Sequence, residues 1–276
     1  MYRKLWSKCQ GGVCAINFYT SKGIRFDSIS GFKYGHYLIT DDMVYKIDRA
    51  SEVQMAFMEE DGVTTKVSVK ITLKDFKSRI VQGVRESIPG FALIDIDFPQ
   101  FDCILSLKLS NKKDTSIGAS IALIGHQKEH NNLALKTGTI SSYSKQNGTK
   151  YIQFDAAVDK GNSGCPLIDA ESGEVIGIVG HRLANIIESH KKLMLIINNN
   201  LAMLKEAEGK IQLHDIDPIQ VLIANQNQIK HLAQEMFKTS SFMYGFALNI
   251  EQVAEYFDIV ELEKEKSVEF ISVYRQ

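Results

Sequence analysis

From Gly12 to about Gly180 the chain alternates between short apolar segments and clusters of turn residues, and few folds can accommodate that pattern. Apolar runs of about four to eight residues bounded by Gly, Asn, Asp or Ser are typical of antiparallel β-strands. The clearest candidates are residues 13–18, 37–40, 66–73, 91–96, 120–125, 135–141, 151–154 and 175–179. Short strands at this spacing predict an all-β domain built as barrels or as a sandwich.

Between residues 186 and 238 the periodicity changes, because apolar residues now recur every three or four positions, as on one face of an α-helix. One stripe comprises Leu193, Ile197, Leu201 and Leu204, and a second comprises Leu222, Ile229, Leu232 and Met236. Asp217 can cap the second helix, and Pro218 suits its first turn, where no N–H is needed. We expect an α-helical pair, then a strand over 242–248, a short helix through Phe257 and a last strand over 268–274.

The apolar residues 193–197 are consecutive, so they cover more than one face of the first helix. We favour burial of this helix between the β domain and the second helix, since large apolar residues are mostly buried. The alternatives are an apolar surface that binds a partner, or a strand over the same residues. Basic and acidic residues balance within the pair, so a membrane or nucleic-acid partner is not indicated.

Charge and composition argue against several classes of partner. Lysine and arginine number 32 against 33 aspartate and glutamate residues, so no net field attracts nucleic acid or an anionic membrane. No stretch is apolar enough over the length needed to span a bilayer, and residues 1–10 lack the apolar run of a signal peptide. The four cysteines, Cys9, Cys14, Cys103 and Cys165, match no zinc-binding pattern. We expect a cytoplasmic protein without a metal, a cofactor, or a nucleic-acid or membrane partner.

The clearest chemical motif is residues 155–168, Asp-Ala-Ala-Val-Asp-Lys-Gly-Asn-Ser-Gly-Cys-Pro-Leu-Ile, in which Ser163 has glycines on both sides. A hydrolytic serine needs a tight turn whose backbone amides converge on the developing oxyanion, and glycine permits that backbone. This segment resembles the nucleophile loop of trypsin-like serine proteases, closest to the bacterial high-temperature-requirement branch. Residues 121–125, 137–141, 173–180 and 244–248 are similar, in the same order, to other strands of that family.

The resemblance implies two antiparallel six-stranded β-barrels, with residues 1–110 in the first and residues 111–276 in the second. The helical pair, at about 183–241, would then be an insertion at a place where the family usually has a short hairpin. The amides of Gly161 and Ser163 would form the oxyanion hole. Ala157 would form the base of the specificity pocket, whose wall would comprise Ile178, Val179, Gly180 and His181. A small residue at the base implies a pocket for an aliphatic side chain, although a collapsed pocket is equally compatible with the sequence.

Two positions depart from the family pattern. The Thr-x-Ala-His-Val run that carries the general base corresponds here to residues 40–44, which place Met43 where the histidine belongs. The Asp-x-Ala-Leu-Ile run corresponds to residues 90–94, which place Gly90 where the aspartate belongs. A thioether cannot accept the serine proton, and losing base-assisted attack lowers turnover by a factor on the order of 10⁶. Ser163 is therefore interpreted as a vestigial nucleophile.

Several residues could supply a substitute base. His36 lies at the far end of the strand that precedes Met43, too distant to reach Ser163. The remaining candidates are His126 and His130 in the loop expected after Gly125, His181 at the mouth of the cleft, and Asp41 and Asp42 beside the lost base. Solvated surface positions are the simpler interpretation of the loop histidines, and a carboxylate is a weak base unless its pKa is raised.

These observations favour a catalytically inactive homologue, a pseudoprotease, that binds a peptide or protein through the cleft, the helical insertion or both. The alternative is a weak or specialised serine endopeptidase that uses Ser163 with a non-standard base or a base supplied by a partner. A third possibility is a structural component of a larger assembly. The groups within hydrogen-bond distance of the Ser163 hydroxyl bear most directly on this choice.

Overall fold

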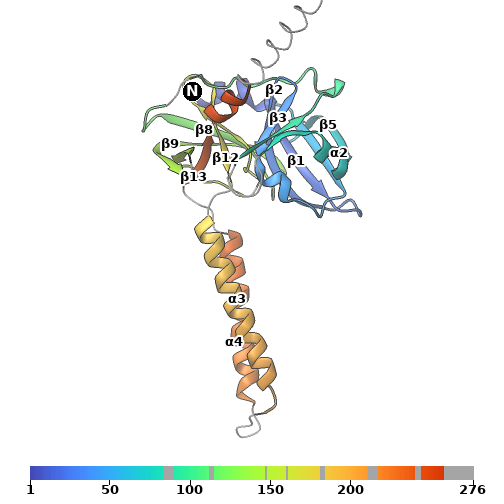
Figure 1. Cartoon of the computed structure of the whole chain (residues 1–276), viewed down its shortest axis with the longest axis vertical. Helices are drawn as coiled ribbons and strands as arrows, with labels where there is room; N and C mark the ends of the chain where they lie inside the picture. The colour runs from blue at the N-terminus through green and yellow to red at the C-terminus, as the bar shows by residue number, and fades with distance from the viewer. Residues whose placement is uncertain are drawn as a thin grey trace, which may run out of the picture. The chain divides into compact units, whose positions relative to one another are not determined.

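The computed structural model describes residues 1–83, 90–111, 115–146, 148–159, 161–180, 184–210, 217–239 and 244–257. The chain divides into two compact units, Met1–His181 with Phe242–Gln276, and Arg182–Ser241. The described strands all belong to the first unit, and two long helices form the second (Figure 1). The division of the β domain between residues 110 and 111 stays a prediction, because both of its sheets lie in one unit.

The first half of the β domain is a seven-stranded antiparallel sheet. Its strands are β1 (Val13–Tyr19), β2 (Arg25–Tyr34), β3 (Tyr37–Asp41), β4 (Glu52–Met58), β5 (Thr65–Thr72), β6 (Ile80–Gly83) and β7 (Phe91–Asp95). They are ordered β5-β4-β1-β2-β3-β7-β6. The sheet curls around a core that includes Phe18, Leu38, Phe57, Phe76 and Ile94. It has one strand more than the predicted six.

The second half closes into the predicted six-stranded barrel. Its strands are β8 (Ser120–Gln127), β9 (Asn132–Gln146), β10 (Thr149–Phe154), β11 (Pro166–Asp169), β12 (Val175–Gly180) and β13 (Gly245–Asn249). The barrel order is β10-β13-β12-β11-β8-β9. Leu123, Phe154, Leu167 and Val179 fill its interior. The predicted all-β class is confirmed, and helices are a minority of the chain.

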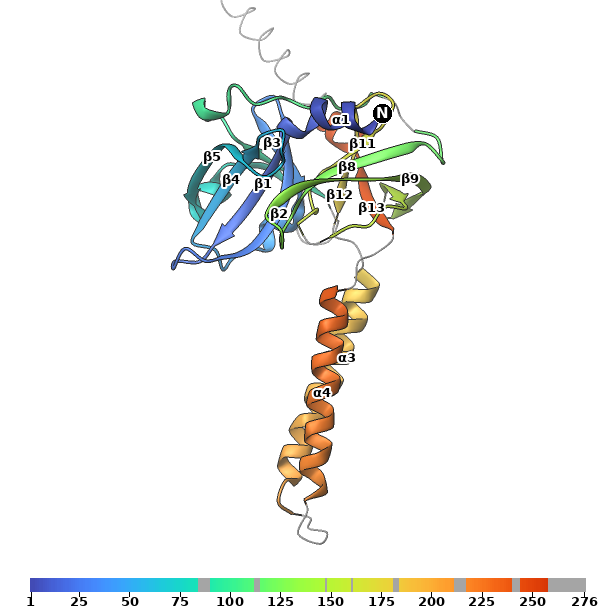
Figure 2. The same cartoon turned by 180° about the vertical axis from the view of Figure 1, so that it is seen from behind.

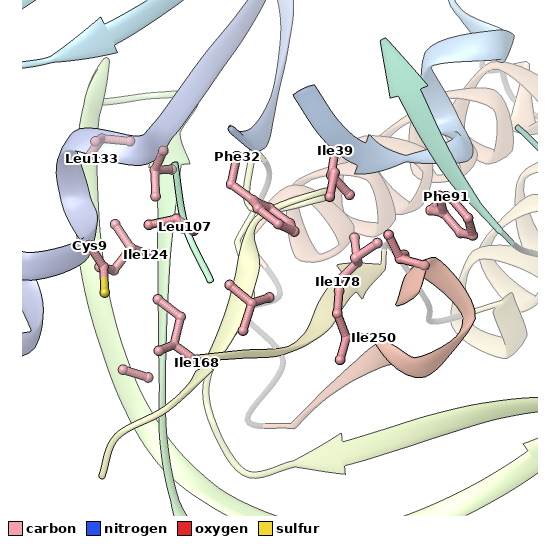
Figure 3. Close-up of a cluster of buried hydrophobic side chains, with 14 of the residues drawn as sticks. Cys9, Phe32, Ile39, Phe91, Leu107, Ile124, Leu133, Ile168, Ile178 and Ile250 are labelled. Carbon is pink, nitrogen blue, oxygen red and sulfur yellow. The ribbon is translucent and has the colours of Figure 1, made fainter. Parts of the chain in front are cut away.

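A third cluster of buried side chains joins the two halves (Figure 3). Phe32 and Ile39 of the first sheet pack there with Ile124 and Ile178 of the second. Successive residues of a strand face opposite sides, so Leu38 enters the first core while its neighbour Ile39 enters the shared cluster. Burial on both sides explains why such strands read as nearly continuous apolar runs.

Short helices cover the ends of the sheets. They are α1 (Tyr2–Cys9), η1 (Gln10–Gly12), η2 (Asp42–Lys46), α2 (Leu73–Ser78), η3 (Pro99–Phe101) and a final helix at residues 251–257. Helix α1, which Figure 2 shows near β8, buries Leu5 and Cys9 in the shared cluster. The helix through Phe257 was predicted, whereas the predicted strand over 268–274 lies outside the described residues.

The insertion is the predicted helical pair, α3 (Ala184–Ala207) and α4 (Pro218–Thr239). The helices run antiparallel, since His190 near the start of α3 stacks on Phe237 near the end of α4. Asp217 caps α4 as expected, because its Oδ1 accepts a hydrogen bond from the Ile219 amide at 2.8 Å. None of the described helices combines the length and the apolar character needed to cross a membrane.

The favoured burial of residues 193–197 is wrong, although the helix itself is confirmed. Leu193, Leu195 and Ile196 are exposed by 43%, 61% and 56% of their surface, while Ile197 is buried. Five consecutive helical residues point around the whole circumference, so one neighbouring helix cannot cover them all. The stripe predicted on α4 likewise turns away from α3, because its four members are all exposed.

Candidate active site

The nucleophile loop connects β10 to β11 and packs directly on the first sheet. Gly161 and Gly164 have φ angles of 98° and 83°, in the left-handed region that favours glycine. A Cβ atom on Gly164 would lie 2.1 Å from Thr40 Oγ1 and 2.2 Å from the Ser30 carbonyl oxygen. A Cβ atom on Gly161 would lie 2.6 Å from the His126 carbonyl oxygen. Backbone conformation and close packing therefore both require the two glycines.

Ser30 on β2 holds this loop by two hydrogen bonds and binds β8 by a third. Its Oγ donates to the Gly161 carbonyl at 2.7 Å, and its amide donates to the Ser163 carbonyl at 2.8 Å. The same Oγ accepts a hydrogen bond from the His126 amide at 2.8 Å. Sequence reasoning missed Ser30. The available signal was the pair Ser28 and Ser30, two polar residues on the same side of a strand that otherwise contributes apolar residues to the core.

Ser163 is buried, with 6% of its surface exposed, and its Oγ has no hydrogen-bond partner within the described residues. The amides of Gly161 and Ser163 likewise donate to no acceptor in the described part of the chain. Their neighbours are paired, since the Asn162 amide donates to Asp159 and the Gly164 amide donates to Val179. Unpaired amides in buried backbone are rare in folded proteins. This pair has the chemistry of an oxyanion hole.

The residues at the base and aspartate positions lie beside η2. Met43 is half-buried in that helix, and its amide donates to Asp41 Oδ1 at 2.8 Å. Gly90 is buried just before β7, and its amide donates to Asp42 Oδ2 at 3.2 Å. Because Asp42 directly precedes Met43, the structure brings the two positions to one short segment. That they face Ser163 across the two halves stays a prediction.

Asp41 is the candidate carboxylate that the structure places closest to the nucleophile loop. It is buried, and its amide lies 2.9 Å from the Cβ position of Gly164. Its Oδ2 lies 3.3 Å from the Cβ position of Gly180 on β12. The carboxylate is therefore held between the start of η2 and β12, next to the turn that carries Ser163.

His126 is not in a loop, which corrects the prediction from sequence. It lies on β8 and is fully buried, because β8 continues two residues beyond Gly125. Its Nδ1 lies 2.8 Å from Ser28 Oγ and its Nε2 lies 3.4 Å from Asn131 Oδ1. Burial, followed by repulsion from Arg25, lowers the pKa of His126 to about 4. Both ring nitrogens thus face partners other than Ser163.

The remaining histidine candidates bring no described imidazole to the loop. His130 is exposed in the turn after β8. His36 is exposed and its ring contacts that of Tyr37 in a tilted arrangement, with centroids 4.0 Å apart. His181, also predicted on the pocket wall, lies outside the described residues. No cluster of three or more His, Cys, Asp or Glu side chains that could hold a metal occurs in the described ranges.

The other residues predicted to line the pocket have different environments. Ala157 and Gly180 are half-buried. Ile178 is buried in the shared cluster, and Val179 is buried inside the barrel, so both side chains serve the cores. Cys165 also fills the barrel core, and burial raises the pKa of its thiol, which disfavours the reactive thiolate. Among the described residues predicted to line the pocket, only Ala157 and Gly180 are partly exposed, and the pocket itself stays a prediction.

Comparisons with known proteins agree with this geometry. The family model described as "Trypsin-like peptidase domain" matches residues 30–178. The HtrA-type protease AlgW, solved with a tripeptide, is 21% identical with a TM-score of 0.50, over 65% of this chain and 54% of that one. A serine endoprotease from Yersinia pestis is 18% identical with a TM-score of 0.51, over 67% of this chain and 59% of that one. The chain thus spans little more than half the length of these proteins, and at these identities they show the fold alone. A comparison with curated proteins found no match. From its match over more than half of its length, the chain belongs to the trypsin-like peptidase domain family.

Proposed function

We propose that the chain is a trypsin-like peptidase homologue without peptidase activity that binds a peptide or protein at the Ser163 loop, its helical insertion or both. The observation that carries the proposal is the set of groups around the Ser163 hydroxyl. Its Oγ has no hydrogen-bond partner within the described residues, while the neighbouring amide donors are retained. The family's base and aspartate positions hold Met43 and Gly90.

This combination suits binding better than turnover. Attack on a carbonyl needs a base that takes the proton from Oγ, and the Met43 thioether has no basic nitrogen. The amides of Gly161 and Ser163 can still donate to a main-chain carbonyl or to a carboxylate. Without an activated nucleophile, an oxyanion hole and substrate binding leave an acceleration of only about 10³–10⁴ over water. A polypeptide ligand with a small aliphatic side chain near Ala157 matches these groups.

The second candidate is a weak or specialised serine endopeptidase. The observation that favours it is the position of Asp41, a buried residue whose amide lies beside Gly164 and whose carboxylate lies beside Gly180. The Asp41 carboxylate could accept the proton from Ser163 Oγ efficiently only if its pKa were raised towards neutrality. A base supplied by a partner chain could accept that proton instead.

The first experiment measures activation of Ser163 with a fluorophosphonate probe at neutral pH, using trypsin as a positive control. We expect labelling of the protein no greater than that of Ser163→Ala under conditions that label trypsin fully. Stoichiometric labelling that disappears in Ser163→Ala would show an activated serine and reject the proposal. If Asp41→Asn also removed that labelling, Asp41 would be the base.

The second experiment tests binding. Peptides selected from a random display library against the whole protein are measured by calorimetry with two arginine variants. Ala157→Arg fills the predicted pocket, whereas Ser21→Arg places an arginine in the exposed turn between β1 and β2, outside both proposed binding elements. We expect the peptides to bind the wild type and Ser21→Arg equally and to lose at least about tenfold in affinity to Ala157→Arg. Equal affinity for all three proteins would exclude the Ser163 loop as the binding site.

A further inference from the structure

Helices α3 and α4 meet along a narrow seam (Figures 1 and 2). Buried or half-buried positions recur every three or four residues, at His190, Met194, Ile197, Leu201 and Leu204 of α3 and at Ile219, Ile223, Gln226, Lys230, Ala233 and Phe237 of α4, and Ala207, Gln234 and Glu235 are also half-buried. Among the described side chains of the pair, only Ile197, Leu201 and Ile219 are fully buried. Two α4 seam positions are a glutamine and a lysine. So small an apolar seam leaves an isolated helical pair marginally stable.

A second set of large apolar side chains lies outside the seam. These side chains are exposed by 43% to 70% of their surface, and they are Leu193, Ile196 and Met203 of α3 and Leu222, Ile229, Leu232 and Met236 of α4. Asn200 and Asn225 occupy the intervening positions of the same three-and-four spacing. Each helix therefore carries a second stripe, and its large apolar side chains are exposed.

The two stripes emerge on one side of the hairpin. Successive residues of an α-helix are rotated by about 100° around the helix axis. On both helices the stripe therefore lies roughly 60° to 140° around the axis from the centre of the seam, and the direction of rotation is the same on both. Two antiparallel helices are related by a two-fold axis perpendicular to the plane that contains both helix axes. This rotation moves a residue from one helix to the other but leaves it on the same side of that plane. The stripes therefore form one continuous surface, which we call the apolar face.

The opposite side of the hairpin is more polar. Its exposed positions include Lys191, Asn198 and Lys205 on α3 and Gln220, Asn227 and His231 on α4, together with the large apolar side chain of Leu195. The apolar face has neither an acidic nor a basic residue among its nine positions, seven apolar side chains and two asparagines. Helices with one polar side and one wide apolar side are typical of bundles in which a further layer covers the apolar side.

We propose that the apolar face binds the same face of a second copy of this chain, forming an intermolecular four-helix bundle. A face without charge has no means to select an oppositely charged partner, so its complement is another uncharged apolar helical surface. A second copy supplies that surface with matching length and spacing. Two-fold pairing of identical patches is also the commonest arrangement in oligomers. This inference goes beyond the proposed function and does not depend on the chemistry at Ser163.

The size of the face is compatible with a stable dimer. A large apolar side chain that is about half exposed presents roughly 100 Å². The seven apolar side chains therefore offer roughly 700 Å² on each copy, close to the roughly 800 Å² per partner of a standard interface. Area alone does not fix the affinity, and we expect a dissociation constant of roughly micromolar order.

The test is sedimentation equilibrium of the full chain between about 1 and 100 µM, a range that brackets the expected dissociation constant. Two neighbouring residues of α3 provide a matched pair of variants, because Ile196 lies on the apolar face and Leu195 lies off it, and both are exposed. Ile196→Glu is expected to weaken dimerisation by at least about tenfold, since it would bury an unpaired charge. Leu195→Glu is expected to leave the dimer unchanged. Ile229→Glu on α4 is a second variant with the same expected loss.

Circular dichroism of each variant checks that the helices persist. A wild type that stays monomeric over the whole concentration range would overturn the proposal, as would equal weakening by Ile196→Glu and Leu195→Glu. Flotation with vesicles of phosphatidylcholine and phosphatidylglycerol tests a lipid surface as the occupant. Monomeric protein whose vesicle binding is lost in Ile196→Glu would reassign the face to lipid and reject the dimer. None of these outcomes bears on fluorophosphonate labelling of Ser163.

Discussion

Acidification should destabilise this protein through His126. The folded state holds the imidazole without exposure to solvent, with its pKa lowered from 6.5 to about 4 by burial. In the unfolded chain the same group titrates near its ordinary value. Between pH 6.5 and 4 the unfolded state therefore binds a proton that the folded state excludes, and stability falls as the pH falls. The stability that the neutral, buried imidazole contributes is fully present above pH 6.5 and fully lost below pH 4. At about 1.4 kcal/mol per pH unit, the loss is about 3 kcal/mol.

The assay is urea unfolding at a series of pH values between 7 and 4, followed by the fluorescence of the single tryptophan. Trp6 reports unfolding because its indole N–H donates to the Glu60 carbonyl at 2.8 Å in the folded state. The comparison is with His126→Asn, whose side chain can bond to Ser28 and does not titrate in this range. Carboxylates contribute equally to both proteins, so the difference between their unfolding free energies isolates the histidine.

As the pH falls from 7 to 4, the unfolding free energy of the wild type should fall by about 3 kcal/mol more than that of His126→Asn. Parallel pH profiles for the two proteins would show that His126 titrates alike in the folded and unfolded states. The inference that the imidazole is buried and neutral behind the nucleophile loop would then be refuted.

Two further substitutions test the packing of the loop and the start of α4. Gly164→Ala adds a methyl group that would lie 2.1 Å from Thr40 Oγ1 in left-handed backbone, so we expect a loss of about 3 kcal/mol in unfolding free energy. Gly35→Ala is its control, since that glycine has a φ of 57° and open space around its Cβ position, and denaturation should show a loss of only about 1 kcal/mol. Asp217→Ala removes the cap of α4. Hydrogen exchange of the amides in the first turn of that helix should then show a loss of about 1 kcal/mol in local stability. Unchanged protection of these amides would contradict the capping role.

Much of the fold was predictable because its patterns are local. Short, nearly continuous apolar runs bounded by turn residues marked β1, β3, β7 and β8, and the Gly-Asn-Ser-Gly segment around Ser163 marked the family. Strand β2 was not among the clearest candidates, because Ser28 and Ser30 interrupt its apolar pattern. Those serines are buried between the two halves of the domain, where polar partners from β8 and the nucleophile loop satisfy them. A strand whose inward residues are polar cannot be recognised from periodicity alone.

The candidate site was predictable only where a motif carries it. Short family runs point to residues 161–164, Met43 and Gly90, and the roles assigned to these residues stay predictions. The bond from Ser30 to Gly161 joins residues separated by 131 positions, so no local pattern could predict it. The same limit applies to the hairpin. Periodicity predicted both helices, but which stripe of α4 contacts α3 depends on the pairing of two helices, and the stripe at Leu222 and Ile229 turned out to be exposed.

The position of the insertion has a consequence for how the chain folds. Strands β12 and β13 pair directly, with Gly180 opposite Phe246, although the whole insertion separates them in sequence. An unstructured connection of about 60 residues would raise the entropic barrier to this pairing by roughly 2–3 kcal/mol relative to a tight turn. Helical hairpins rely on local contacts and form early, within microseconds to milliseconds. Once α3 and α4 pair, the chain returns towards its starting point, and the insertion acts as one long turn. Closure of the barrel should therefore wait for the hairpin, so that substitutions which weaken α4 slow refolding of strands that they never touch.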